Sequence, residues 1–270
     1  MKGLPDYAGR TAIVTGASTG IGAELARQLA RRGMRVALVA RREAELEQVA
    51  AGIRAAGGDA IVVPCDVGER ASVERAAEGT LGRLGRIDLL VNNAGYNTHG
   101  LFKDHPVDDI ERMFRVNVLG QVWWIKAVLP AMRRRGEGWI VNLSSVAGKL
   151  GQPDEAVYAS TKFAISGLSE SLAYEFDPLG IHVLCVHPAV VRTEMFTPEV
   201  LARMPEVAKR AFIEPDVFCA AVLRALERGD YEVTVPRHVG FSYVFRLLVP
   251  GMFRRATARM RLPVLPDLTT

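Results

Sequence analysis

Residues 11–22 read TAIVTGASTGIG, and this stretch decides the fold. The run Thr11–Thr15 is apolar and partly β-branched, which is typical of a buried strand. Three glycines follow: Gly16 permits a tight turn, Gly20 lets the backbone approach a phosphate, and Gly22 lets the next helix pack close to the strand. The N-terminus of that helix offers free N–H groups to a pyrophosphate. The alternative is a plain tight connection, because three residues separate the first two glycines where the G-x-G-x-x-G pattern has one.

Outward from this stretch, short β-branched runs alternate with longer amphipathic segments. The strands that we expect are 11–15, 35–40, 60–64, 87–92, 139–143, 182–187 and 231–235. The main helices that we expect between them are 21–32, 43–56, 72–84, 107–135 and 155–176. The strands show little alternation, as in a parallel sheet that helices cover on both sides. We therefore predict an α/β fold of about seven parallel strands, with one domain over residues 1–236.

Composition and charge exclude several classes of protein. The chain is 49% hydrophobic and 24% charged, as ordinary globular proteins are. Without a signal peptide or a run of 18 apolar residues, we expect a cytoplasmic protein. The five histidines show no metal-ligand spacing, so we expect no metal, and no G-x-S-x-G elbow predicts a hydrolase. The near-neutral body predicts no nucleic-acid partner. Sparse, well-separated cysteines predict no disulfide framework; they are Cys65, Cys185 and Cys219.

The ends of the second and third strands bear on the choice of cofactor. Enzymes that select NAD usually place a carboxylate after the second strand, whereas an arginine there can hold a 2′-phosphate. Here Arg41 and Arg42 follow the strand. We predict NADP(H) in preference to NAD(H), with two solvated residues of the next helix as the alternative. Asp66-Val67 follows the third strand, where the carboxylate can bond an adenine amino group or cap the next helix.

A tyrosine and a lysine four residues apart, Tyr158 and Lys162, share one face of a predicted helix. A fixed ammonium favours the phenolate and lowers the pKa of the phenol, which makes the pair a plausible proton-transfer device. Such pairs also arise by chance, with a half-packed tyrosine and a solvated lysine.

Several motifs in order resemble the short-chain dehydrogenase/reductase family over nearly the whole chain. The matching pieces are Thr15-Gly16, Gly20-Ile21-Gly22, Asn92-Asn93-Ala94-Gly95, Asn117, Ser145, Tyr158 and Lys162. The resemblance implies a Rossmann-type doubly wound sheet and carbonyl/alcohol chemistry that depends on a nicotinamide. The cofactor-binding residues would be Gly16, Ser18, Thr19, Gly20, Ile21, Gly22, Arg41, Arg42, Asp66, Val67, Asn93, Ala94, Gly95, Tyr158, Lys162, Pro188, Val191 and Thr193.

The same resemblance implies four catalytic residues. Tyr158 would be the general acid in reduction and the base in oxidation. Lys162 would bond the nicotinamide ribose, and Ser145 the substrate oxygen, with Ser144 as the competing candidate. Asn117 would hold a water in a proton relay; from the sequence alone, a bond to helix backbone explains it better.

One departure concerns the loop after the sixth strand, where the family commonly has Pro-Gly and this chain has Pro188-Ala189. If the glycine serves a positive φ, Ala189 incurs strain. The nearby His187 reads as structural. Asn92 is expected to tie neighbouring strands together.

Residues 192–214 should cover the substrate, and their apolar side chains suggest a lipophilic carbonyl or alcohol compound, or simple packing of the lid. Trp123 and Trp124 fit either a homodimer or homotetramer interface or the core. Residues 237–270 form a basic amphipathic extension, since 233–270 hold six arginines and one acid. Over 240–261 this extension can contact a membrane surface, pack on a neighbouring subunit or border the substrate mouth.

These observations lead to an NADP(H)-dependent oxidoreductase that transfers a hydride. The alternatives are a cofactor-binding regulatory or interaction protein on an inactive reductase scaffold and a 3-oxoacyl-carrier-protein-type reductase.

Overall fold

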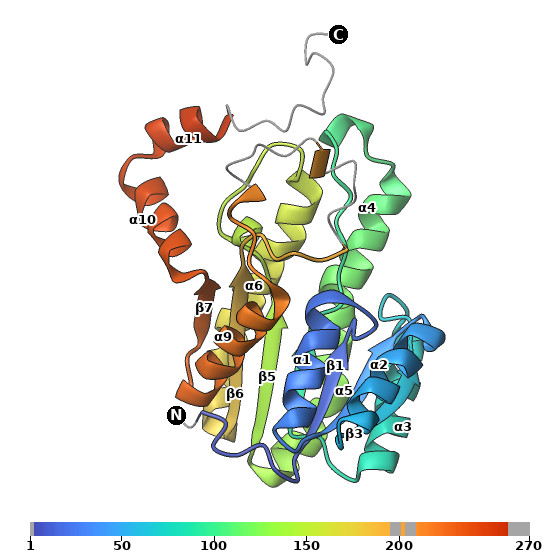
Figure 1. Ribbon diagram of the computed structural model, residues 1–270. Coiled ribbons are helices and arrows are strands. Elements are labelled where there is room, and N and C mark those ends of the chain that lie inside the picture. The colour runs from blue at the N-terminus through green and yellow to red at the C-terminus, as the bar shows by residue number, and fades with distance from the viewer. Residues whose placement is uncertain (1–2, 195–200, 203–208, 259–270) are drawn as a thin grey trace.

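A seven-stranded parallel sheet forms the centre of the molecule (Figure 1). The computed structural model describes residues 3–194, 201–202 and 209–258. The strand order is β3-β2-β1-β4-β5-β6-β7, and every neighbouring pair is parallel. The predicted α/β, doubly wound Rossmann-type architecture is therefore confirmed. The strands are β1 (Thr11–Thr15), β2 (Arg35–Ala40), β3 (Asp59–Pro64), β4 (Leu89–Asn92), β5 (Gly138–Leu143), β6 (Ile181–Pro188) and β7 (Glu232–Val235).

Helices cover both faces of the sheet because successive strand residues point to opposite sides. In β1, Ala12 and Val14 belong to one hydrophobic cluster and Ile13 belongs to the other. The first cluster contains apolar residues of α1 (Gly20–Arg31), α2 (Glu43–Ala55) and α9 (Pro215–Arg228). The second contains residues of α3 (Arg70–Leu84), α5 (Gly120–Arg135) and α6 (Ala156–Phe176).

The helix expected over 107–135 is divided in the structure. It consists of α4 (Val107–Phe114), a π-helical turn η2 (Arg115–Leu119) and α5. A π turn holds one more residue than an α-helical turn and is often found at functional sites. Asn117 lies inside it and is buried. The other element ends agree with the sequence prediction to within two residues.

Strand order reverses at β1, since β2 lies on one side of it and β4 on the other. In open α/β sheets, ligands bind beside the carboxyl ends of the strands at such a switch point. The segments after β1 to β4 therefore define the place where a site is expected.

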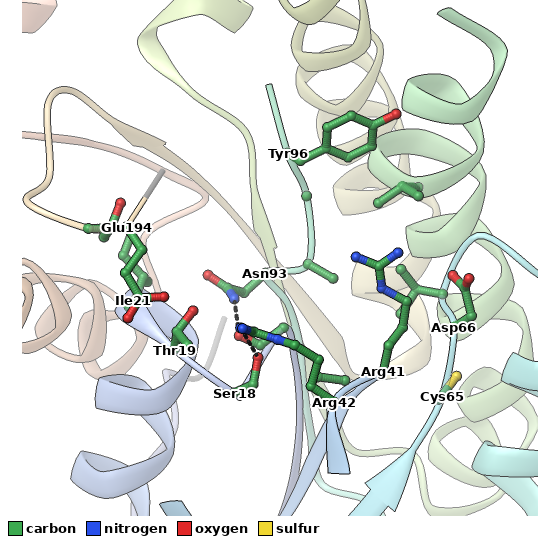
Figure 2. Close-up of a pocket in the computed structure, with 18 of the residues that line it drawn as sticks. Ser18, Thr19, Ile21, Arg41, Arg42, Cys65, Asp66, Asn93, Tyr96 and Glu194 are labelled. Carbon is green, nitrogen blue, oxygen red and sulfur yellow. Dashed lines mark hydrogen bonds between the residues drawn. The ribbon is translucent and has the colours of Figure 1, made fainter. Parts of the chain in front are cut away.

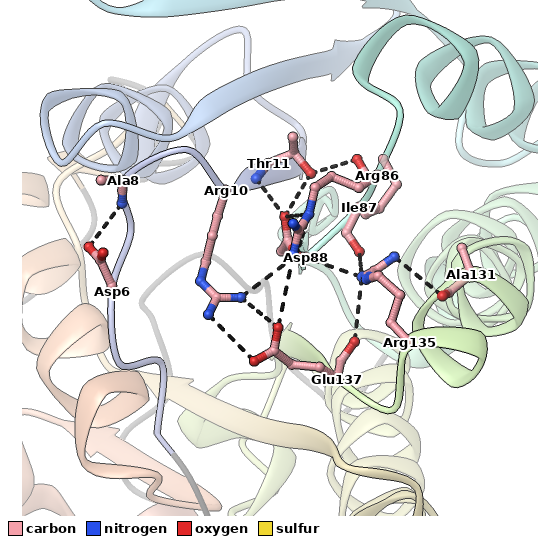
Figure 3. A network of polar contacts seen from close by, with 10 residues as sticks. All are labelled: Asp6, Ala8, Arg10, Thr11, Arg86, Ile87, Asp88, Ala131, Arg135 and Glu137. Carbon is pink, nitrogen blue, oxygen red and sulfur yellow. Dashed lines mark hydrogen bonds and ion pairs between the residues drawn. The ribbon is translucent and has the colours of Figure 1, made fainter.

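At the opposite, amino-terminal end of the sheet lies a buried carboxylate, Asp88 (Figure 3). It accepts hydrogen bonds from the backbone N–H of Thr11 at 2.8 Å and from Nε of Arg86 at 2.9 Å. The guanidiniums of Arg10 and Arg135 approach its Oδ1 at 3.8 and 3.7 Å. A buried charge is tolerated when it is paired and hydrogen-bonded in this way. The network fixes β1 against β4 far from the carboxyl ends.

Beyond β7 the chain forms a C-terminal arm, residues 237–258, which extends away from the sheet edge (Figure 1). It consists of η5 (Arg237–Gly240), α10 (Phe241–Leu248) and α11 (Pro250–Ala258). The helical spacing and the break at Pro250 agree with the sequence prediction. Among the described residues, no helix is long and apolar enough to cross a membrane.

Candidate active site

A cavity of about 620 Å³ opens at the switch point, against the segments that follow β1, β2, β3 and β4 (Figure 2). Its volume lies within the usual range of small-molecule and cofactor sites. Most of the residues predicted to bind a cofactor line it: Gly16, Ser18, Thr19, Gly20, Ile21, Arg41, Arg42, Asp66, Val67, Asn93, Ala94, Gly95 and Thr193. The structure thus brings together groups that come from five separate segments of the chain.

The glycine turn has the geometry that its sequence predicts. Gly16 and Gly20 have φ values of +65° and +57°, in the left-handed region that favours glycine. A Cβ on Gly22 would lie 2.2 Å from the carbonyl oxygen of Gly16, so only glycine lets α1 pack this close. A Cβ on Gly16 would lie 2.8 Å from the Asn93 side chain. The turn therefore exposes backbone N–H groups at the start of α1, the arrangement that binds phosphates.

Asn93 and Thr15 hold this turn against the end of β4. The Thr15 hydroxyl accepts hydrogen bonds from the N–H groups of Asn93 and Ala94 at 2.9 and 3.0 Å. The Asn93 amide donates to the Thr15 carbonyl at 2.9 Å. One strand further, the Asn92 amide donates to Asn142 at 2.9 Å, which confirms that Asn92 ties β4 to β5.

Arg41 and Arg42 lie at the end of β2, and both line the cavity. Arg42 donates to the Ser18 hydroxyl at 3.2 Å and pairs with Glu45 at 3.2 Å. Residues 40–42 contain no carboxylate, so a 2′-phosphate would meet two guanidiniums rather than an acid. The residues present therefore fit a phosphorylated dinucleotide.

Asp66 does not cap α3, because the cap position is Glu69. Its Oδ1 accepts from the Gly68 N–H at 2.9 Å, and its Oδ2 accepts from Arg112 at 2.6 Å. Burial by itself raises the pKa of Asp66, but these hydrogen bonds and the nearby guanidiniums bring the pKa below its ordinary value. Asp66 is therefore a fixed carboxylate at the edge of the cavity. Sequence reasoning missed Arg112, which lies 46 residues away on α4.

Tyr158 and Lys162 lie on α6, with the Lys162 Nζ 5.5 Å from the centre of the Tyr158 ring. The same Nζ donates to the Leu143 carbonyl at the end of β5, at 3.0 Å. Burial lowers the pKa of Lys162 to about 8.

The sequence predicts a lowered Tyr158 pKa, but the groups that the chain itself places around the phenol raise that pKa. Burial raises that pKa most, the carboxyl of Glu155 raises it further, and a hydrogen bond with Ser145 opposes them. Desolvation of the phenolate is the largest cause of the raised pKa, and the Lys162 ammonium is hydrogen-bonded to a backbone carbonyl.

The two neighbouring serines have different partners. The Ser144 hydroxyl is buried and bonds the Lys162 carbonyl and Ser166, both at 2.9 Å. The Ser145 hydroxyl accepts from the Ala147 N–H at 3.1 Å, and it lies near enough to Tyr158 to oppose the rise in the pKa of that phenol. Ser145, rather than Ser144, is therefore the serine beside the tyrosine. The fully buried His187 holds the Ser145 carbonyl at 3.0 Å, which is a structural role.

Asn117 connects the cavity to α6. Its amide donates to the Tyr96 carbonyl at 2.9 Å and to Thr161 at 3.2 Å, and its Oδ1 accepts from the Tyr96 N–H at 3.0 Å. A Cβ on Gly95 would lie 3.1 Å from that Oδ1 and 3.6 Å from the Lys162 Nζ. Asn117 and Lys162 are thus close to the same point of the loop after β4.

Some predicted residues do not line this cavity, namely Gly22, Tyr158, Lys162, Pro188 and Val191. Val191 is buried and pairs with Ile213. Ala189 donates its N–H to the Val235 carbonyl at 2.9 Å. It does not have a positive φ, so replacement of the family's glycine causes no backbone strain of that kind here. Of the expected lid 192–214, residues 195–200 and 203–208 lie outside the described residues.

A second group that sequence reasoning missed is the polar cluster beside Tyr158. Glu155 is the cap residue of α6, and its Oε1 accepts from Asn97 at 3.1 Å and lies 3.6 Å from His99. Burial raises the pKa of Glu155 to about 7, with a further contribution from Asp154, while the Asn97 bond lowers it. Burial also raises the pKa of Asp154 to about 6. The available signal was an acid three residues before the tyrosine, one helical turn away.

Trp124 is fully buried in the core, whereas Trp123 is partly buried. The three cysteines are free and buried. Among the described residues, no group of three His, Cys, Asp or Glu side chains is placed to hold a metal.

Comparison with known proteins agrees with this geometry. The family model for short chain dehydrogenases matches residues 10–203. A ketoacyl reductase, HetN, from Nostoc sp. is 32% identical over 227 residues, which are 84% of this chain and 78% of the relative. A short-chain dehydrogenase from Sphingobium yanoikuyae, solved with NADPH, is 31% identical with a TM-score of 0.79 and covers 96% of this chain and 99% of its own.

A third protein, from Burkholderia phymatum and solved with NAD, supports the fold alone. It is 24% identical, has a TM-score of 0.82 and covers 97% of this chain and 99% of its own. The chain belongs to the short-chain dehydrogenase/reductase family of NAD(P)-binding oxidoreductases.

Proposed function

We propose that this protein is an NADP(H)-dependent oxidoreductase that interconverts a carbonyl compound and a primary or secondary alcohol. The single observation that carries the proposal is that the Lys162 Nζ lies 5.5 Å from the centre of the Tyr158 ring and also close to Gly95, which lines the nucleotide cavity. Bound NADP(H) would supply or accept the hydride.

The roles proposed for the chain's own residues follow from their contacts. Tyr158 gives its phenolic proton to the substrate oxygen in reduction and takes it back in oxidation. Ser145 holds that oxygen, because its hydroxyl lies beside Tyr158. Lys162 provides positive charge beside the phenol, and Asn117 links this end to the loop after β4.

We assign four parts of the cofactor to residues in and beside the cavity. Glycine backbone from Gly16 to Gly22 would hold the pyrophosphate, and Arg41 with Arg42 would hold the 2′-phosphate. Asp66 and Val67 would meet the adenine, and Pro188, Val191 and Thr193 the nicotinamide end. The absence of an acid after β2 is what favours NADP(H) over NAD(H).

Tyr158→Phe tests the mechanism. The variant should bind NADPH as the wild type does and lose turnover by about 10²-fold or more, since only the transferable proton is removed. A screen of carbonyls and alcohols, followed at the NADPH absorbance, first supplies a substrate. Unchanged turnover of a verified substrate by the variant would overturn the assignment.

The substrate class that we favour is lipophilic, from the apolar residues of the 192–214 segment. A 3-oxoacyl-carrier-protein-type reductase is the second candidate, favoured by the similarity to a ketoacyl reductase and by the basic C-terminal arm, which would suit an acidic carrier. A regulatory cofactor-binding protein is the third. Turnover of 3-oxoacyl-carrier protein but not of the free thioester would select the second, and NADPH binding without turnover in the screen would select the third.

We further propose a homodimer or homotetramer in the cytoplasm. The family's usual interface helices correspond to α5 and α6, and α6 exposes Phe163 and Tyr174. Tyr174 is 74% exposed, which is unusual for a large aromatic side chain. Light scattering of the wild type and of Tyr174→Asp tests this, because a buried charge should dissociate such an interface. A monomeric wild type would refute it.

A further inference from the structure

The C-terminal arm presents large apolar side chains that the rest of the chain does not cover. No residue of α10 or α11 is buried. Leu247, Phe241 and Leu248 are 79%, 76% and 75% exposed, and Met252 on α11 is 57% exposed. Scattered exposed apolar residues are normal in soluble proteins, but a contiguous group of this kind marks an interaction surface.

Four of the five exposed apolar side chains of α10 follow one helical face, and Leu247 lies beside that face. Phe241, Val244, Phe245 and Leu248 have the i, i+3, i+4, i+7 spacing of an amphipathic helix. The rings of Phe245 and Phe253 meet edge to face at 6.1 Å, which joins α10 to α11. The arm is therefore one amphipathic unit made of two short helices.

The base of the arm is attached to the domain by polar and aromatic contacts. The Thr234 hydroxyl donates to Tyr243 at 3.2 Å. Arg246 donates to the Lys149 carbonyl, and its guanidinium lies 5.8 Å from the centre of the Phe163 ring. These contacts hold the arm in place, and its large apolar side chains remain exposed.

Charge identifies the kind of partner. Residues 233–258 contain four arginines and no aspartate or glutamate. Arg254 and Arg255 on α11 are exposed, and neither forms an ion pair with a residue that the structure describes. An apolar face bordered by arginine is the pattern of helices that lie in the interface of an anionic bilayer.

A second copy of the chain fits this surface less well. In a two-fold contact the same patch meets itself, so the arginines of one arm would face those of the other. Anionic headgroups neutralise the arginines while the acyl region accepts the leucine and phenylalanine side chains. We propose that the C-terminal arm docks the protein on an anionic membrane surface.

The position of the arm determines which edge of the sheet would face the membrane. The arm leaves the sheet at the carboxyl end of β7, the edge at which the cavity opens and at which Ser145 follows β5. Docking would therefore turn the edge that carries the candidate active site toward the lipid. Delivery of a lipophilic substrate from the bilayer would follow, and this consequence alone rests on the proposed function.

Vesicle sedimentation tests the docking without any measurement of turnover. The wild type should pellet with vesicles of phosphatidylcholine and phosphatidylglycerol at least about tenfold more than with phosphatidylcholine alone, and high salt should release it. Leu247→Ser/Leu248→Ser and Arg254→Gln/Arg255→Gln should each reduce binding to anionic vesicles by about tenfold or more. All four side chains are exposed, so the fold should be retained, as circular dichroism can verify.

Matched controls come from exposed apolar residues elsewhere on the surface. Val107→Ser and Val217→Ser remove side chains that are 68% and 56% exposed outside the arm, and vesicle binding should not change. Failure of the wild type to pellet with anionic vesicles would overturn the proposal. So would a loss of self-association in the arm variants with unchanged vesicle binding, which would identify a second copy as the partner.

Discussion

The guanidinium of Arg42 donates to the hydroxyl of Ser18 at 3.2 Å, which joins the end of β2 to the glycine turn after β1. One side chain thus connects the segment proposed to hold the 2′-phosphate with the segment proposed to hold the pyrophosphate. Glu45 pairs with the same guanidinium at 3.2 Å and keeps it over the start of α2.

Removal of both guanidiniums should change cofactor selectivity. We expect Arg41→Ala/Arg42→Ala to weaken NADPH binding by about 10- to 100-fold, because one or two charge-assisted hydrogen bonds are lost. NADH binding should change little. Fluorescence titration with each nucleotide measures this. Arg31→Ala, an exposed arginine on α1, is the matched control. Equal losses for the two nucleotides would contradict a 2′-phosphate role.

Arg112 should act differently, because its partner Asp66 would meet the adenine that both nucleotides share. Arg112→Leu removes the 2.6 Å contact that holds the carboxylate. We expect both NADPH and NADH to bind about tenfold more weakly, with their ratio preserved. Isothermal titration can check this. A loss confined to NADPH would instead place Arg112 among the phosphate ligands.

Glu155 should shape the pH dependence of turnover. Its carboxylate, which forms as the pH rises through about 7, raises the pKa of Tyr158. Alcohol oxidation needs the ionised phenol, so Glu155→Gln should move the rise of the oxidation rate toward lower pH by roughly one unit. Glu170→Gln, on the exposed side of the same helix, should leave the profile unchanged.

The same carboxyl should also affect stability. Its pKa is about 4.5 in the unfolded chain and about 7 in the folded one, so its stabilising contribution is complete below pH 4.5 and is lost as the pH rises through 7. Relative to wild type, Glu155→Gln should gain up to about 3 kcal/mol of unfolding free energy between pH 4 and pH 8. Urea denaturation at the two pH values measures the unfolding free energies. An equal difference between variant and wild type at both pH values would refute the raised pKa of Glu155.

Asp88 should be essential for stability and irrelevant to cofactor binding. Asp88→Ala leaves Arg86, Arg10 and Arg135 around a buried gap and should lower the unfolding free energy by about 3–5 kcal/mol. Asp59→Ala breaks only a surface pair with Arg35 and should cost less than about 1 kcal/mol. Thermal denaturation compares them, and NADPH affinity of folded Asp88→Ala should match the wild type.

Much of this fold follows from local sequence. Strands buried on both faces are continuous apolar runs, which is why 35–40 was predicted with the bounds that β2 has. The glycine turn was predictable because Gly16, Gly20 and Gly22 each meet a local steric need.

Features that depend on contacts between distant segments could not be predicted in the same way. The Arg112–Asp66 pair joins α4 to the end of β3, and no spacing in the sequence signals it. The raised pKa of Tyr158 depends on how far its environment excludes water, which residue types alone do not give. The π turn adds one residue to a helix whose apolar pattern looks continuous.

That extra residue sets the rotational phase of two helices relative to each other. An α-helix turns about 100° per residue, so a wide turn at η2 rotates everything on α4 against everything on α5 by about that angle. Arg112 can then reach Asp66 while Trp124 stays in the core, and Asn117 between them reaches Tyr96 and Thr161. Deletion of Leu119 alone would disconnect the nucleotide end of the site from its proton-transfer end, with every residue of both ends unchanged.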